Sequence, residues 1–103
     1  MHLIELNAGS WKATSDIYAD LLPALGAPAW HGDSIDALLD TTIWGGGGIN
    51  TIDPPFSIRI RNSKSAPQEV RDHLKAMADA LQKARGQFRQ LHGRDIEARL
   101  DVE

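Results

Sequence analysis

The segment FSIRIR, residues 56–61, alternates strictly between apolar and polar side chains. Such alternation is typical of a β-strand that has one face on the core and the other in water. The inward side chains are then Phe56, Ile58 and Ile60. A parallel sheet that helices cover on both faces would have continuous apolar runs instead. The segment therefore predicts a sheet that is covered on one face and open on the other.

Two further strands are expected near the ends of the chain. One is His2–Asn7, which is short and rich in apolar residues. The other is Asp95–Val102, which alternates in the same way as residues 56–61. The residues of this last strand that we expect to point inward are Ile96, Ala98, Leu100 and Val102.

A helix is expected over Thr14–Gly26, with Thr14 or Ser15 as its N-cap and Gly26 at its end. Pro23 lies inside this helix and has no backbone N–H to donate. Because the residue before a proline also disfavours the helical conformation, we expect a kink or a shortened helix there.

A long amphipathic pattern follows residue 65. The sequence SAPQ, residues 65–68, resembles a capping box that begins at Ser65, with proline just inside the helix. Gly93 is the expected end of the helix, and Gly86 either ends it earlier or weakens it. The buried stripe consists of apolar residues three and four apart: Val70, Leu74, Met77, Leu81, Ala84, Phe88 and Leu91.

The order strand, two helices, strand, helix, strand implies parallel strands joined by right-handed crossovers. Helices connected in this way share one face only if the chain keeps winding in one direction. Arg59 and Arg61 would then lie between Glu5 on one neighbouring strand and Glu97 and Asp101 on the other, where opposite charges pair. We therefore predict one two-layer α/β domain over residues 1–103, with a three-stranded parallel sheet in the order 1-2-3 and helices on one face.

The net charge of −3 is distributed unevenly along the 103 residues. Between Ala13 and Ile58 there are six aspartates and no lysine or arginine, whereas ten basic and seven acidic residues lie between Arg59 and Glu103. An acidic half favours a positively charged partner and argues against direct binding of nucleic acid by that half.

The chain contains no cysteine, which excludes a disulfide framework, a thiol nucleophile and a cysteine-based zinc site. The first residues lack the basic and apolar regions of a signal peptide, and no apolar run is long enough to span a membrane. We therefore expect a cytoplasmic protein that does not contact a membrane.

The segment WHGDSIDALLD, residues 30–40, predicts a short helix that Asp33 or Ser34 caps. Its buried residues are Ile35, Leu38 and Leu39. Asp36 and Asp40 lie on the opposite side, one turn apart, where like charges destabilise a helix by about 0.2–0.5 kcal/mol. A solvated helix face would have the same pattern. The lack of basic residues and the tryptophans on both sides favour a binding role instead.

The same segment resembles the signature of the barstar family, the intracellular inhibitors of barnase-type ribonucleases. This signature consists of an aromatic pair, Gly, two polar residues, an aliphatic or aromatic residue, Asp-Ala-Leu, a large residue and Asp. The expected order of elements is similar to that of the family over nearly the whole chain. The resemblance implies an inhibitor that blocks a ribonuclease active site, binds its basic enzyme one to one and is monomeric when free. It implies no catalysis, no cofactor and no metal.

The resemblance also implies a set of partner-binding residues: Trp30, His31, Gly32, Ser34, Asp36, Asp40 and Trp44. Asp40 matches the aspartate that enters the phosphate-binding pocket of the enzyme, and Asp36 matches a second one that faces basic residues at its rim. Trp30 matches an aromatic residue that packs on the enzyme, and Gly32 a close backbone contact. Trp44 matches a nearby tryptophan after an offset of one residue. Carboxylates on a rigid helix can replace substrate phosphates in contacts with arginine.

Other functions have less support. The run Gly45–Gly48 lacks the Lys-Ser/Thr of a phosphate-binding loop, so we expect a mobile lip beside the binding face. The four histidines do not have metal-ligand spacing. An enzyme that used His31 with Asp33 or Asp36 would lack a recognisable nucleophile and oxyanion site. The main alternative keeps the fold and makes the chain an immunity or adaptor protein for a different basic toxin or protein partner.

Overall fold

The computed structural model describes residues 1–103. Its strands are β1 (His2–Asn7), β2 (Phe56–Arg61) and β3 (Ala98–Val102). Its α-helices are α1 (Thr14–Leu25), α2 (Ile35–Leu39) and α3 (Gln68–His92), and a π-helical turn, η2 (Asp40–Trp44), continues α2. The 3-10 turns are η1 (Ala8–Ser10) and η3 (Ser63–Ser65).

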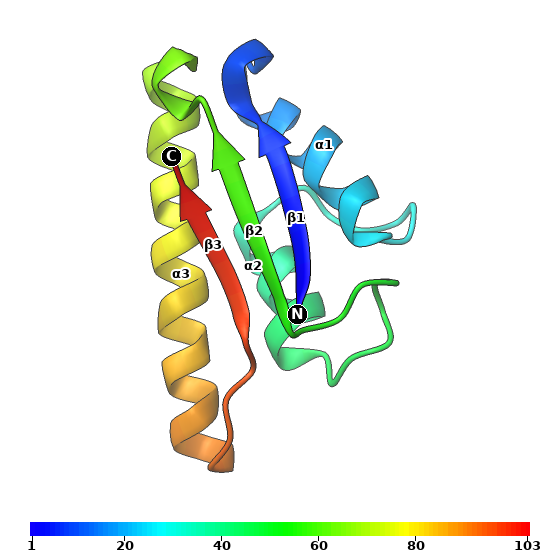
Figure 1. Cartoon of the computed structure of the whole chain (residues 1–103). Helices are drawn as coiled ribbons and strands as arrows, with labels where there is room; N and C mark the ends of the chain where they lie inside the picture. Colours follow the sequence, from blue (N-terminus) through cyan, green and yellow to red (C-terminus); the bar gives the residue numbers. More distant parts are fainter.

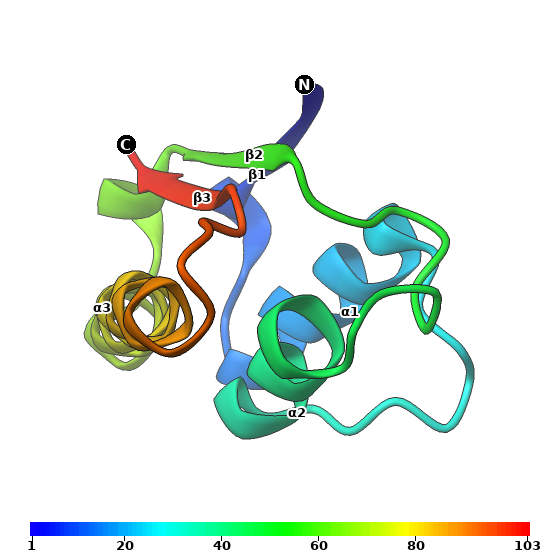
Figure 2. The same ribbon diagram turned by 90° about the horizontal axis from the view of Figure 1, so that it is seen from below.

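The three strands form a parallel sheet in the order β1-β2-β3, which confirms the predicted topology (Figure 1). Ile58 of β2 lies between Ile4 of β1 and Leu100 of β3. All three α-helices lie on one side of the sheet, and the other side is open (Figure 2). The alternation in β2 has the predicted effect, because Phe56 and Ile60 are buried on the helical side together with Ile58.

β3 is shorter than predicted, because the pairing with β2 begins at Ala98 instead of Asp95. Val102 lies opposite the buried Ile60 and therefore takes the covered face, as predicted, but its side chain is exposed and does not join the core. It is the last residue of a strand at the edge of the sheet, where no further element covers it. Ile96 and Leu100 are only partly buried. Alternation shows on which face of the sheet a side chain lies, but it does not show how far along the strand the packed helices cover that face.

Ion pairs cross the open face of the sheet. Glu5 of β1 lies 3.2 and 3.9 Å from the two arginines of β2, as predicted. On the other side of β2, Arg59 reaches Glu103, at 3.1 Å. The pairs expected there with Glu97 and Asp101 do not form. Glu5, Arg59 and Arg61 therefore have ion-pair partners within the chain, one of them beyond the end of β3, whereas Asp101 on the same face has none.

The start of α1 differs from the prediction, because neither Thr14 nor Ser15 caps it. The carboxylate of Asp16 accepts hydrogen bonds from the backbone N–H groups of Lys12, at 2.7 Å, and Ala13, at 3.1 Å. These bonds favour the charged form and hold the pKa of Asp16 below its usual value.

α1 is not shortened at Pro23, contrary to one of the expected outcomes, and continues to Leu25. Pro23 cannot donate to the carbonyl of Ala19, four residues earlier. Both residues are exposed, so water can satisfy that carbonyl. Gly26 then ends the helix in a left-handed conformation, with φ of +64°.

α3 runs for 25 residues without a break at Gly86, and Gly93 ends it with φ of +71°. The predicted capping box at Ser65 is absent, because Ser65 belongs to η3 and Pro67 precedes the helix without a side-chain cap. Leu91 is exposed, contrary to the prediction. The last turns of α3 extend past the start of β3, where no strand covers them (Figure 1).

One apolar cluster between the sheet and the helices forms the core. It joins α1, α2, η2 and α3 to the covered face of the strands, so that α2 is held through Leu38. The short helix that carries the two aspartates is therefore attached to the core.

No helix has both the length and the apolar character needed to cross a membrane.

Candidate protein-binding site

Of the two caps that the sequence offered for helix α2, Asp33 and Ser34, the structure has Ser34. The Ser34 hydroxyl accepts a hydrogen bond from the Ala37 N–H at 3.1 Å, which makes Ser34 the N-cap. Leu38 faces the core and is buried. This anchoring fixes the direction of the opposite, solvent-facing side of the helix.

Asp36 and Asp40 are exposed on that side, as the helical spacing predicts. Neither carboxylate forms an ion pair or a side-chain hydrogen bond within the chain. Each one is therefore hydrated in the free protein and available to a cation of another molecule. Since the residues lie one helical turn apart, two such cations can be bound side by side.

The sequence did not indicate that α2 would continue as the π-helical turn η2. Two threonine hydroxyls bond back to the Leu38 carbonyl, from Thr41 at 3.2 Å and from Thr42 at 2.7 Å. Serine and threonine that bond back in this way alter helix geometry, and π-turns are often found at functional sites. The adjacent Thr41 and Thr42 are the feature of the sequence that could have indicated this turn. η2 carries the chain from Asp40 to Trp44.

The side chain of His31 is buried, with only 7% of its surface exposed, so little of this predicted binding residue is available to a partner in the free protein. Its Nδ1 lies 2.8 Å from the Gly32 carbonyl, which can only accept. Nδ1 therefore carries a hydrogen, and Nε2 lies within hydrogen-bond distance of the Thr41 hydroxyl oxygen, at 2.8 Å. Asn50 donates to the same hydroxyl oxygen at 3.2 Å. His31 thus fastens the segment before α2 to the turn after it.

Gly32 also has a structural role. A Cβ atom at this position would lie 3.2 Å from the Cβ of Ala37, closer than most such contacts. The absence of a side chain lets the segment before α2 pass close to the first turn of the helix. Gly32 is also exposed at the surface.

The two tryptophans next to the helix differ in their surroundings. Trp30 is 73% exposed, although it precedes the buried His31. Trp44 is 40% exposed, and its ring centroid lies 5.9 Å from that of Phe88 on α3. Exposed tryptophan is unusual in a free protein and enriched in protein interfaces. An aromatic group therefore lies at each end of the acidic helix.

Below the start of α2, the Tyr18 hydroxyl lies 2.6 Å from Nε2 of His73 on α3. Burial, together with the negative charge of Asp33, raises the pKa of Tyr18 to about 12. The phenol therefore keeps its proton and can donate to the histidine. This contact ties α1 to α3 behind the binding helix.

The family model described as Barstar (barnase inhibitor) matches residues 1–102 of the chain. The chain belongs to the barstar family. A comparison with curated proteins finds no significant match. The family is one of inhibitors and not of enzymes, and its partners are ribonucleases.

In this barstar-family protein the predicted site residues separate into two groups. Those with surface available to a partner are Trp30, Gly32, Ser34, Asp36, Asp40 and Trp44. The buried His31 forms the other group, and both His31 and Ser34 use their polar atoms to hold the segment and the helix in place. Sequence reasoning missed Thr41 and Asn50, which complete the support from below. No group of three or more His, Asp or Glu side chains is arranged to hold a metal ion.

Proposed function

We propose that this protein inhibits a barnase-type ribonuclease in the cytoplasm, binding it one to one and covering its active site with α2. The observation that carries the proposal is the pair of exposed, unpaired carboxylates of Asp36 and Asp40 on one side of a helix. A ribonuclease holds RNA phosphates with cationic side chains. Carboxylates can form the same charge-assisted hydrogen bonds with those groups.

The support beneath the helix strengthens this proposal. Leu38 is in the core, and His31 joins the two ends of the segment through Thr41. Carboxylates on such a base lose little conformational freedom when a partner binds, which limits the entropic cost of association. The acidic half of the chain also accelerates the encounter with a basic enzyme, and added salt reduces this effect.

An inhibition titration tests the proposal, with barnase as the probe. Increasing amounts of the protein are added to a fixed amount of enzyme, and RNA cleavage is followed. We expect cleavage to fall to zero at equimolar protein, and Asp40→Ala to weaken inhibition more than any other single change. Asp79→Ala is the matched control, because Asp79 is exposed and unpaired but lies on α3. Equal inhibition by the wild type and Asp40→Ala would contradict the proposed role of α2.

A second candidate is an immunity or adaptor protein that binds another basic protein through the same helix. The same carboxylates support it, since they select for cations and not for ribonucleases in particular. Affinity capture from the native host distinguishes the two. Recovery of a ribonuclease through wild-type protein but not through Asp40→Ala supports inhibition of a nuclease, whereas recovery of a basic non-nuclease supports the second candidate.

A further inference from the structure

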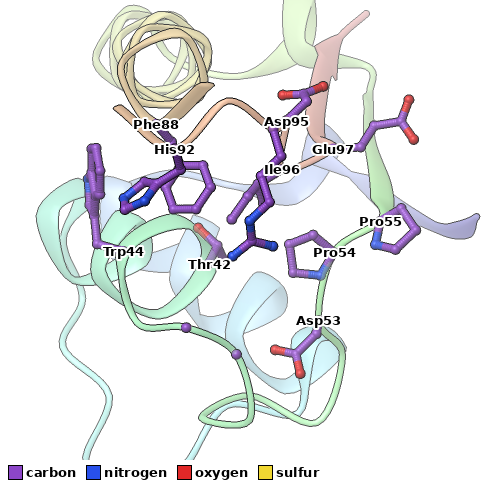
Figure 3. A pocket seen from close by; sticks show the side chains of 13 residues that line it. Thr42, Trp44, Asp53, Pro54, Pro55, Phe88, His92, Asp95, Ile96 and Glu97 are labelled. Atoms are coloured by element: carbon purple, nitrogen blue, oxygen red, sulfur yellow. The ribbon is translucent and has the colours of Figure 1, made fainter. Parts of the chain in front are cut away.

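A cavity of about 700 Å³ adjoins the end of η2. Its walls come from η2, the glycine-rich loop that follows, the end of α3 and the segment that leads to β3 (Figure 3). Trp44, Phe88, Pro54 and Ile96 supply its apolar surface. Trp44 belongs both to this wall and to the aromatic border of the acidic helix, so the cavity continues the candidate binding surface.

Arg94 lines the cavity and has no carboxylate partner in the chain. Its guanidinium carbon lies 5.3 Å from the centre of the Phe88 ring, a stacking arrangement that holds the group in place. It forms no ion pair with any carboxylate of the protein. A positioned guanidinium of this kind presents several N–H donors to a ligand.

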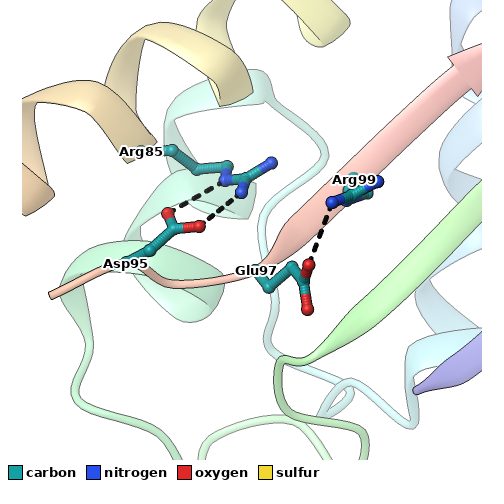
Figure 4. A network of polar contacts seen from close by, with 4 residues as sticks. All are labelled: Arg85, Asp95, Glu97 and Arg99. Atoms are coloured by element: carbon teal, nitrogen blue, oxygen red, sulfur yellow. Dashed lines mark hydrogen bonds and ion pairs between the residues drawn. The ribbon is translucent and has the colours of Figure 1, made fainter.

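The carboxylates in the wall are already engaged. Asp95 accepts hydrogen bonds from Arg85 at 2.6 and 3.3 Å, and Glu97 pairs with Arg99 at 3.0 Å (Figure 4). Asp53 accepts from a backbone N–H of the glycine-rich loop at 2.9 Å. Among the Asp, Glu and Arg side chains of the cavity wall, Arg94 is therefore the one that has neither an ion pair nor a hydrogen bond within the chain.

We propose that this cavity receives an acidic side chain of the bound ribonuclease, whose carboxylate pairs with Arg94 while a neighbouring apolar side chain packs on Trp44 and Phe88. The inference rests on the proposed function, because it assigns a second contact to the same partner. Charge complementarity supports it, since Arg94 is a cation in the cavity wall without a carboxylate partner in the chain, and a carboxylate of the ribonuclease supplies the opposite charge. A partner must then match two charges of opposite sign at the correct separation, and a uniformly basic protein is disfavoured.

The free protein tests this site directly with two small probes, acetyl-Leu-Glu-amide and its neutral counterpart acetyl-Leu-Gln-amide. The Trp44 indole N–H and the Arg94 Nε–H are followed by NMR during each titration. We expect the glutamate peptide to shift both signals with a dissociation constant in the millimolar range, at least fivefold tighter than the glutamine peptide. Arg94→Ala should reduce that preference to about one. Equal effects of the two peptides, or no shift with either, would overturn the inference.

Arg89→Ala is the matched control, because Arg89 is exposed near the end of α3 and does not line the cavity. It should preserve the preference for the glutamate peptide. Loss of the preference in both variants would mean that net charge, and not this cavity, selects the peptide.

The barnase complex supplies an independent measurement. If the wild type binds barnase, Arg94→Glu should increase the dissociation rate at least tenfold and Arg89→Glu should change it less than twofold. Equal rates in the two variants would remove the cavity from the interface. If the wild type does not bind barnase, the proposed function fails, and the peptide titration still decides whether Arg94 selects a carboxylate.

Discussion

The binding helix and the open face of the sheet are both charged and solvent-exposed, but they treat their charges differently. On the sheet, Glu5 pairs with the arginines of β2, and Arg59 also reaches Glu103. On α2, Asp36 and Asp40 have no partner in the chain. Exposure alone therefore does not indicate function in this protein. The distinction lies in whether the chain supplies its own counter-charges.

The largest expected effect concerns the two unpaired carboxylates. Replacing both, as Asp36→Asn with Asp40→Asn, should weaken ribonuclease binding by at least 100-fold. Truncated charge pairs in protein interfaces, barnase–barstar among them, generally lose about 2–5 kcal/mol. The free energy of unfolding should rise by about 0.2–0.5 kcal/mol, because the repulsion across one helical turn disappears. Calorimetric titration and denaturant unfolding measure the two quantities. A marked loss of stability would mean that the carboxylates support the fold instead.

The next effect concerns the buried support of the helix. Thr41→Val keeps the volume but leaves His31 Nε2 and the Asn50 amide without their shared partner. Buried polar groups without partners cost about 1–3 kcal/mol, and we expect a loss of that size in the free energy of unfolding. Thr51→Val is the control, because the Thr51 side chain makes one exposed hydrogen bond, to the Gly26 carbonyl, which also accepts from the Thr51 backbone N–H. Similar losses of the free energy of unfolding in both variants would show that the buried hydrogen bonds of Thr41 contribute no more to stability than an exposed one.

A smaller effect is expected on the open face of the sheet. Glu5→Gln removes two ion pairs that are both well exposed to solvent. Exposed ion pairs contribute little to stability, so the free energy of unfolding should fall by at most about 1 kcal/mol. Ribonuclease binding should not change. A loss of binding comparable to that of Asp40→Ala would place the sheet in the interface and remove the distinction between the two surfaces.

The smallest expected effect is a dependence of stability on pH near the end of α3. The hydrogen bond from Arg85 holds the pKa of Asp95 below its usual value of 3.8. A carboxyl with a lowered pKa in the folded state stabilises the fold above its unfolded pKa, and this contribution is lost as the pH falls through the folded pKa. Acid unfolding of Asp95→Asn should therefore depend less steeply on pH below about 4 than that of the wild type. Identical profiles would show that the pair does not contribute.

The sequence predicted the sheet and its order because both depend on local patterns. Alternation in residues 56–61 identified an open face, and the handedness of crossovers then left one order. The positions of Asp36 and Asp40 followed from helical spacing in the same way. The family match agrees with the resemblance seen in residues 30–40.

The remaining features depend on contacts between distant residues. His31 looked like a surface residue because its partner Thr41 lies 10 positions away and is brought close only by the fold, as is Asn50, which donates to the same hydroxyl oxygen. Leu91 and Val102 continue correct apolar patterns, but the pattern does not show where a neighbouring element ends. The cavity beside Trp44 combines four separate segments, and no local motif announces such a combination.

The different surroundings of the tryptophans have a practical consequence. Trp11 is buried, and its indole donates to Asp20 at 2.6 Å, so its fluorescence should be insensitive to a partner. The Trp30 indole is mostly in water and should emit at shorter wavelength once another protein covers it. The free protein thus carries its own optical reporter of complex formation, and replacing Trp30 by Phe should reduce the spectral change to the part that comes from Trp44, which is 40% exposed.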